Sequence, residues 1–308
     1  MLLIHKTCNR SGLFVIGIAS LLLFLLAGCT SDNFFFEGYD TLLKGKNRPQ
    51  IGILYYPYNK AMSQRLARPI PDYSGWPRER MVKDLHRLND LGVDFIILNV
   101  NTADLKNSHR KSRYLEFFDL VANSQFPNLA FKITSENKLN MDERRYIINW
   151  LVSMCGSDPD AVFNFRGRCL VILPPFVKSW RQTHPSLMFR FTAPERRQWL
   201  WSYPGSGKAY TLGYQAKQAT VYGGWQGDDT GNNSWLLPRE KGRTLQHALR
   251  TVVGRGADII CVDSWNNFKD GSFIEPNTLD SRSVYKTLQE EIRRIKKAGS
   301  DRVTVTPR

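Results

Sequence analysis

The sequence contains few of the side chains and patterns that build metal centres or repeat folds. It has 5 cysteines in 308 residues, and none are spaced as CxxC or as another familiar metal-ligand pair. No internal repeat and no low-complexity segment occurs. Acidic residues are also scarce, with 28 Asp and Glu against 43 Lys and Arg. We therefore predict no metal site, no cofactor and no repeat architecture.

The first residues have the organisation of a bacterial lipoprotein signal peptide. Lys6 and Arg10 form a basic region, residues 13–26 an apolar core, and Leu26-Ala27-Gly28-Cys29 a lipobox. A bare transmembrane anchor is the alternative, but this apolar stretch is too short to span a bilayer comfortably. We predict a signal peptide at 1–28, lipidation of Cys29 and a polar tether at 29–49. The remaining chain would lie on the non-cytoplasmic side of the bacterial cell envelope, on the outer membrane in a Gram-negative cell.

The formal net charge of +15 indicates the class of partner. A positive field attracts polyanions, and outside the cytoplasm these are phospholipid headgroups, lipopolysaccharide or teichoic acids, and acidic polysaccharides rather than nucleic acid. The alternative is a solvated basic surface without a ligand. The three cysteines after the lipobox, Cys155, Cys169 and Cys261, also allow two interpretations. They could form one disulfide and a spare thiol, but we favour three free, buried cysteines because two of them lie in predicted core strands.

Beyond residue 50 the chain alternates short apolar runs with amphipathic stretches. This alternation predicts parallel strands joined by helices, and the length suits one (β/α)8 TIM barrel at 50–299, followed by a tail at 300–308. Gly92 is expected to close the first helix. The expected strands are 51–56, 94–100, 129–134, 168–173, 187–191, 199–203, 219–222 and 258–262, and the expected helices are 79–91, 114–123, 142–154, 243–253 and 281–297.

The stretch 257–277 is the strongest candidate for a functional site. A buried strand is followed at once by a polar loop that carries Asp263, Trp265, Asn266, Asn267, Asp270 and Glu275. In α/β barrels the chemistry lies on loops that leave the C-terminal ends of the strands. We therefore expect Tyr56, Asn99, Glu136, Asp228, Asp263 and Asp270 to open on one end of the sheet.

This loop resembles the signature S-W/F-N-E-W-x-E-G-x-x-I/L-E-P of glycoside hydrolase family 99 and of the related family 71 and WbsX-like proteins. The matching residues are Ser264-Trp265-Asn266, Gly271 and Ile274-Glu275-Pro276. Weaker matches follow in the family's order at 53–58, 91–95, 131–136, 166–171 and 223–225 with 228–229. The resemblance implies a TIM barrel and retaining endo-α-mannosidase chemistry.

The two catalytic positions of the family are changed. The first family Glu, which acts as a base on the sugar 2-hydroxyl, falls on Asn267, and the second, the general acid, falls on Asp270. An amide cannot serve as the base, whereas Asp270 can still protonate a leaving group. Either another carboxylate replaces the lost base, or the barrel binds glycans without hydrolysing them. A third reading is an envelope-assembly factor whose basic face meets lipopolysaccharide.

These readings give the candidate residues. The catalytic candidates are Asp270, Glu136 and Asp263, with Asp228 and Asp229 as further replacements for the base. Flat aromatic faces stack on sugar rings, and neighbouring amides and carboxylates bind hydroxyl groups. For Glu275 the alternative is a bond to backbone groups that holds the loop. The candidates for substrate contact are Asn267, Asn266, Trp265, Glu275, Tyr56, Trp225, Asp228 and Asp229.

Overall fold

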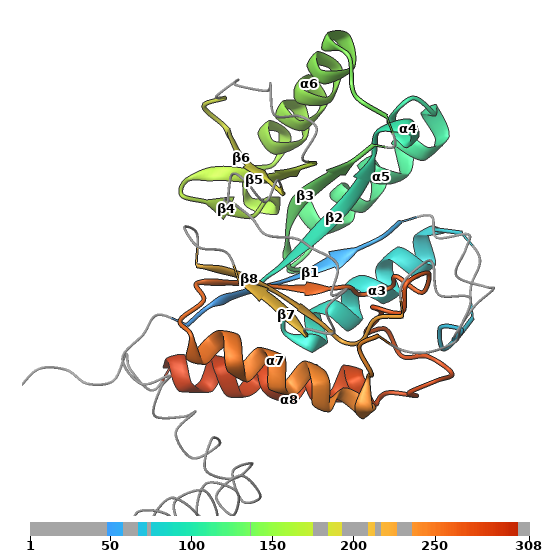
Figure 1. Ribbon diagram of the computed structural model, residues 1–308. Helices are drawn as coiled ribbons and strands as arrows, with labels where there is room; N and C mark the ends of the chain where they lie inside the picture. Colours follow the sequence, from blue (N-terminus) through green and yellow to red (C-terminus); the bar gives the residue numbers. More distant parts are fainter. Residues whose placement is uncertain are drawn as a thin grey trace, which may run out of the picture.

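The computed structural model describes residues 48–57, 67–72, 75–135, 137–174, 184–192, 209–212, 217–226 and 236–300 (Figure 1). The predictions for the signal peptide, Cys29, the tether, Glu136, Asp228, Asp229 and the strand at 199–203 concern residues outside this set. Within it, no helix is both long enough and apolar enough to cross a membrane.

Seven parallel strands form the main sheet. Their order across the sheet is β6, β5, β3, β2, β1, β9, β8. Every predicted strand that falls on described residues is confirmed, with its ends shifted by at most one residue. The bounds are β1 Gln50–Tyr55, β2 Phe95–Asn101, β3 Asn128–Thr134, β5 Arg168–Leu173, β6 Leu187–Phe191, β8 Gln218–Tyr222 and β9 Ile259–Asp263.

Two short antiparallel strands depart from the purely parallel prediction. The strand β4 (Asn164–Phe165) pairs with the start of β5, and β7 (Tyr210–Leu212) pairs with β8. Arg166 and Gly167 both adopt positive φ, at 54° and 75°, which suits the tight two-residue turn between β4 and β5. Among the described residues, no pairing joins β6 to β8.

The helices cover the outer face of the sheet, as Figure 1 shows. Gly92 ends the first of them in the left-handed conformation, which confirms the predicted stop. The helix after β3 begins with a capping box between Asn140 and Glu143. The bounds are α3 Arg78–Leu91, α4 Thr102–Leu105, α5 Ser108–Ala122, α6 Met141–Ser157, α7 Arg243–Gly254 and α8 Ser283–Ser300, with short 3₁₀ turns η2 at Pro159–Ala161 and η5 at Glu240–Gly242.

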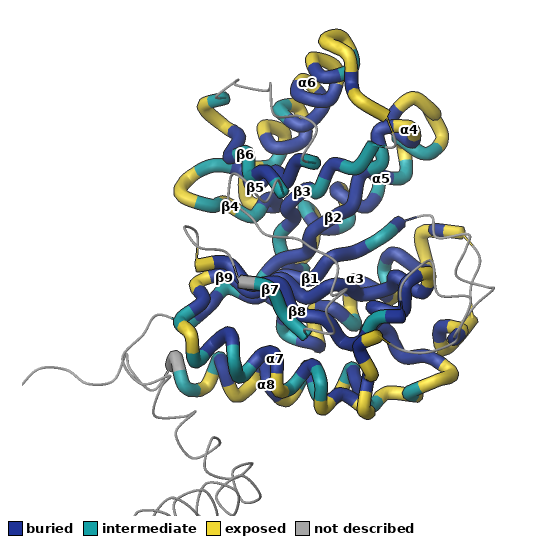
Figure 2. Tube along the Cα trace, viewed as in Figure 1, coloured by how far each residue is buried: buried dark blue, intermediate teal, exposed yellow. Residues whose placement is uncertain are grey.

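Most strand residues are apolar on both faces of the sheet, which explains the burial of the strands in Figure 2. In β1, Ile51, Ile53 and Tyr55 pack against the helices, whereas Leu54 belongs to a second cluster on the inner face of the sheet. That inner cluster contains Leu54, Phe95, Ile97, Ala130, Leu170, Ile172, Ile259 and Cys261. Side-chain direction therefore alternates along each strand, and parity assigns every strand residue to the helix side or to the interior.

Aromatic rings fill the interior near the N-terminal ends of the strands. Gly52 has no side chain because the Phe95 ring occupies that space, and a Cβ there would lie 2.3 Å from a ring carbon. Phe163 stacks on Phe95 with ring centroids 3.8 Å apart. The interior is thus packed at one end, and polar groups collect at the other.

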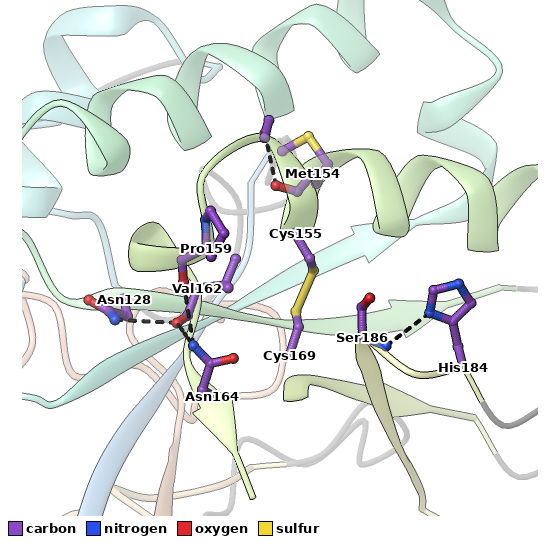
Figure 3. Close-up of a disulfide and its surroundings, with 10 residues drawn as sticks. Asn128, Met154, Cys155, Pro159, Val162, Asn164, Cys169, His184 and Ser186 are labelled. Carbon is purple, nitrogen blue, oxygen red and sulfur yellow. Dashed lines mark hydrogen bonds between the residues drawn. A yellow bond between two sulfur atoms is a disulfide. The ribbon is translucent and has the colours of Figure 1, made fainter. Parts of the chain in front are cut away.

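The expectation of three free cysteines is wrong. Cys155 near the end of α6 and Cys169 in β5 form a disulfide, with Cα atoms 6.4 Å apart, and Figure 3 shows that it ties the helix to the sheet. Cys169 points outward because it alternates with the inward residues Arg168 and Leu170 of β5. Only Cys261 among the described cysteines is free, and it is buried. Burial raises the pKa of its thiol.

Removing this disulfide should lower the stability of the protein. The bridge closes a loop with a sequence separation of 14 residues, for which chain entropy gives about 3 kcal/mol. Cys155→Ala should therefore shift the urea unfolding midpoint downward. A reducing agent should cause a similar shift in the wild type and none in the variant. Equal midpoints for the oxidised and the reduced wild type would contradict the expectation.

Candidate functional site

The loop 263–277 starts at the C-terminal end of β9 and folds back over β1. The Trp265 backbone N–H donates to the Leu54 carbonyl over 2.7 Å, which continues the pairing between the two strands. The Asn266 side chain then binds the backbone of Tyr56 on both sides, accepting from its N–H and donating to its carbonyl, each over 2.8 Å. This fixes the loop to the end of β1.

Two carboxylates meet around one serine in this loop. The Ser272 hydroxyl lies 3.1 Å from Asp263 Oδ1, and the Ser272 backbone N–H donates to Asp270 Oδ1 over 3.1 Å. Both aspartates are nearly buried, with 7% and 9% of their surface exposed. Two carboxylates held close together with little contact to water are typical of acid–base sites.

Asn267, which the resemblance aligns with the family's first Glu, contacts one of these two carboxylates. Its Nδ2 donates to Asp270 Oδ2 over 2.7 Å, and its backbone N–H donates to the Ser264 hydroxyl over 3.0 Å. Asp270 thus accepts hydrogen bonds at both of its oxygens. Neighbouring Phe268, at the family's Trp position, stacks on Phe273 at 4.3 Å and is buried.

Lys132 on β3 is a member of the site that sequence reasoning missed. Burial lowers the pKa of its ammonium, while the negative charges of Asp263 and Asp270 oppose this shift. Both neighbours of Lys132 in β3, Phe131 and Ile133, face the helices, so Lys132 faces the interior. A lysine with this parity inside an apolar strand is the signal that could have revealed it.

Asn99 on β2 stands beside Lys132 in the sheet, because the two residues are register partners. Its Nδ2 lies 3.3 Å from the Thr134 hydroxyl. Its Oδ1 is buried and has no hydrogen-bond partner among the described residues. An unused acceptor at the end of the interior is available to a ligand hydroxyl group.

The structure places Trp265 and Glu275 away from this site. Trp265 is fully buried and packs on Tyr285 in the helix-side core, with ring centroids 6.1 Å apart. Glu275 is also fully buried, and its Oε1 lies 3.5 Å from Arg87 Nη1 of α3. In the structure neither side chain offers surface to a sugar, and Glu275 holds the loop to α3, which is the alternative considered for it.

Asn266 is also buried, and its side-chain amide hydrogen-bonds the Tyr56 backbone. Tyr56 itself is half-buried and packs against the inner cluster. Trp225 is also half-buried, and the next residue, Gln226, donates its backbone N–H to the Asp270 carbonyl over 2.8 Å. Tyr56 and Trp225 therefore remain candidates for stacking beside the carboxylates.

Arg239 holds the loop in place, and the sequence analysis did not predict this role. Its guanidinium donates to the carbonyls of Gly271 and Phe273 over 2.8 and 2.6 Å and to Asp280 Oδ2 over 2.5 Å. It also lies 4.0 Å from the centre of the Phe273 ring. These contacts fix the backbone on both sides of Ser272, the residue that joins the two carboxylates.

The described residues contain no group of three or more His, Cys, Asp or Glu side chains that could hold a metal ion. The groups that the site offers are two carboxylates, one ammonium and several amides. The register of the strands places these groups together at the C-terminal end of the sheet.

Comparison with known proteins identifies the fold. No family model matches the sequence, and no curated protein matches it. Among solved structures, the endo-α-mannosidase of glycoside hydrolase family 99 from Bacteroides thetaiotaomicron, in complex with bis-tris propane, superposes with a TM-score of 0.60 at 16% identity, over 80% of this chain and 98% of that one.

A second structure of the same enzyme gives a TM-score of 0.60 at 15% identity, with the same coverage of both chains. A glycoside hydrolase-like protein gives 0.57 at 10% identity, over 81% of this chain and 95% of that one. At these identities the likeness concerns the fold. The chain is thus similar in fold to the family 99 endo-α-mannosidases, as the ordered motifs of its sequence predicted.

Proposed function

We propose that this protein is a membrane-anchored glycoside hydrolase that acts on a glycan, with Asp270 and Asp263 as its two carboxyl groups. The observation that supports this most directly is Ser272, which hydrogen-bonds both carboxylates at the C-terminal end of the sheet. Two hydrogen bonds and the width of one serine keep the carboxylates within about 10 Å of each other. That is close to the upper limit for inverting glycosidases.

The roles follow from the chemistry of glycosidic bonds. Asp270, at the family's acid position, donates a proton to the glycosidic oxygen as the C–O bond breaks. Asp263 accepts a proton from the water that adds to the anomeric carbon. The positive charge of Lys132 offsets part of the negative charge of Asp263 and Asp270. Asn99 and Asn267 supply amides for the sugar hydroxyl groups.

A second candidate function is glycan binding without hydrolysis. The observation that favours it is the hydrogen bond from Asn267 Nδ2 to Asp270 Oδ2, because a carboxylate that accepts at both oxygens is held in its ionised form. The experiment that separates the two functions is a screen of the full chain against α-mannosides and related glycans. It would measure sugar release and binding for the wild type and for Asp270→Asn.

The cellular location is part of the same proposal. The lipobox supports a bacterial lipid anchor at Cys29, and the disulfide between Cys155 and Cys169 suits an oxidising compartment outside the cytoplasm. The partners would be carbohydrate in the envelope and the membrane that holds the acyl chains. In a Gram-negative cell we place the protein on the outer membrane.

Replacing Cys29 should abolish the anchor. Cys29→Ser removes the thiol that carries the lipid, so we expect loss of fatty-acid labelling and either release from the membrane fraction or an unprocessed precursor. Labelling with a radioactive fatty acid, followed by fractionation, measures both effects. Cys8→Ser, a change before the lipobox, serves as the matched control and should leave labelling intact. Unchanged labelling in Cys29→Ser would refute the anchor.

A further inference from the structure

Three arginines gather where β4, β5 and β6 meet. Arg166 lies in the turn between β4 and β5, Arg168 begins β5, and Arg190 lies near the end of β6. The Arg190 and Arg166 guanidinium carbons lie 5.1 and 5.4 Å from the centre of the Phe165 ring. One aromatic ring therefore brings two of the cations together.

None of the three has an ion-pair partner among the described residues. Arg190 is half-buried, and its Nε is fully shielded from solvent without a hydrogen-bond acceptor. Burial lowers the pKa of Arg190, and the charges of Arg166 and Arg168 lower it further. Arg168 contacts the Met188 sulfur at 3.5 Å, which is a weak acceptor.

Three other shielded arginines of this protein are paired. Arg80 lies 3.3 Å from Asp84, Arg239 lies 2.5 Å from Asp280, and Arg250 lies 2.6 Å from Glu291. Each of these arginines has a carboxylate within ion-pair distance, as desolvated charges generally require. Arg190 is shielded beside two like charges, so its missing counter-charge is expected from a bound anion.

The sheet places Arg190 on the same side as the candidate site. Lys132 of β3 is in register with Ile172 of β5, and Ile172 is in register with Arg190 of β6. Ile172 belongs to the inner cluster, so all three side chains face the interior. Because neighbouring strands lie about 4.8 Å apart, the Cα atoms of Lys132 and Arg190 are roughly 10 Å apart.

We propose that Arg166, Arg168 and Arg190 bind a phosphate or sulfate group carried by a saccharide. Planar guanidinium groups donate in pairs to the oxygens of tetrahedral oxyanions, and three of them match a doubly charged group. Through Ile172, Arg190 is in register with Lys132 of the candidate site, so we assign the anion to a saccharide that also reaches the carboxylates. The saccharide part of this inference depends on the proposed function, and the anion part does not.

Calorimetric titration of the full chain at constant ionic strength tests the proposal. The probes are inorganic phosphate, mannose 6-phosphate and mannose. Arg190→Gln should weaken phosphate and mannose 6-phosphate binding at least about tenfold, because it removes a charge-assisted pair of hydrogen bonds. Arg145→Gln is the matched control, since that side chain is exposed on α6. Equal affinities in Arg190→Gln and in the wild type would overturn the site.

Further arms separate the remaining outcomes. Arg166→Gln changes an exposed turn residue and should also weaken binding. If both variants bind phosphate more weakly, misfolding of Arg190→Gln alone does not explain the loss. If phosphate binds but mannose 6-phosphate does not, or if only phosphatidylglycerol vesicles show a dependence on Arg190, the saccharide assignment is wrong. Asp270→Asn should keep its phosphate affinity, so an inactive hydrolase and a missing anion site would give different results.

Discussion

Asp270→Asn should lower the rate of glycan hydrolysis by about 10²–10⁴-fold while glycan binding stays within a few-fold of the wild type. The amide has the size of the carboxyl group and keeps an acceptor for the Ser272 N–H, and the loop keeps its shape if the Asn267 amide turns its oxygen toward the new NH2 group. What the variant loses is the proton for the leaving oxygen. Sugar release and calorimetric binding on one glycan panel measure the two effects separately. Robust hydrolysis that is undiminished in Asp270→Asn would place the site on other residues.

Asn267→Glu is the informative companion to this experiment. It restores the family residue and replaces the amide donor to Asp270 Oδ2 with a second negative charge. Two adjacent carboxylates do not both ionise readily, so Asp270 should hold its proton to higher pH. If the wild type binds α-mannosides without cleaving them, hydrolysis gained by Asn267→Glu would identify the natural protein as a binder with an intact groove.

Arg239→Ala should destabilise the fold by about 3–5 kcal/mol, the usual cost of removing one member of a buried ion pair. The change leaves the Asp280 carboxylate and two loop carbonyls without their donor, and it removes the cation from the Phe273 ring. Because those carbonyls flank Ser272, binding at the site should weaken together with stability. Urea unfolding followed by circular dichroism measures the free energy.

The matched control is Arg145→Ala on α6. Its guanidinium is largely exposed and lies 4.0 Å from an equally exposed Asp142, so we expect a change within about 0.5 kcal/mol. A double variant that also carries Asp280→Asn should recover part of the loss, because it no longer buries an unpaired charge. A loss below about 1 kcal/mol in Arg239→Ala would mean that the loop is held by other contacts.

The strands were predictable because most of their residues are apolar on both faces. The end of α3 was predictable because Gly92 readily adopts the left-handed conformation that ends a helix. The loop residues were also identified, since polar side chains follow β9 directly. The face of the sheet toward which each loop side chain points could not be predicted. Trp265 points to the helices because the loop pairs with Leu54, a tertiary contact that leaves no trace in local sequence.

The missed residues share a physical reason. Lys132 is one charge in an apolar strand, and its partners Asp263 and Asp270 come from a loop more than a hundred positions later. Arg239 is one basic residue in a chain with many. The disulfide depended on how α6 packs against β5, which spacing alone does not determine.

The packing of Phe95 against Gly52, with Phe163 stacked upon it, closes one end of the interior. A glycan bound at the carboxylates would therefore enter from the C-terminal ends of the strands. Long polymers and short oligosaccharides would present the same few sugar units to the protein. The strand β1 starts at the closed end, so a lipid anchor upstream of Gln50 would join the molecule there. The carboxylates would then lie at the end of the sheet opposite the point of attachment.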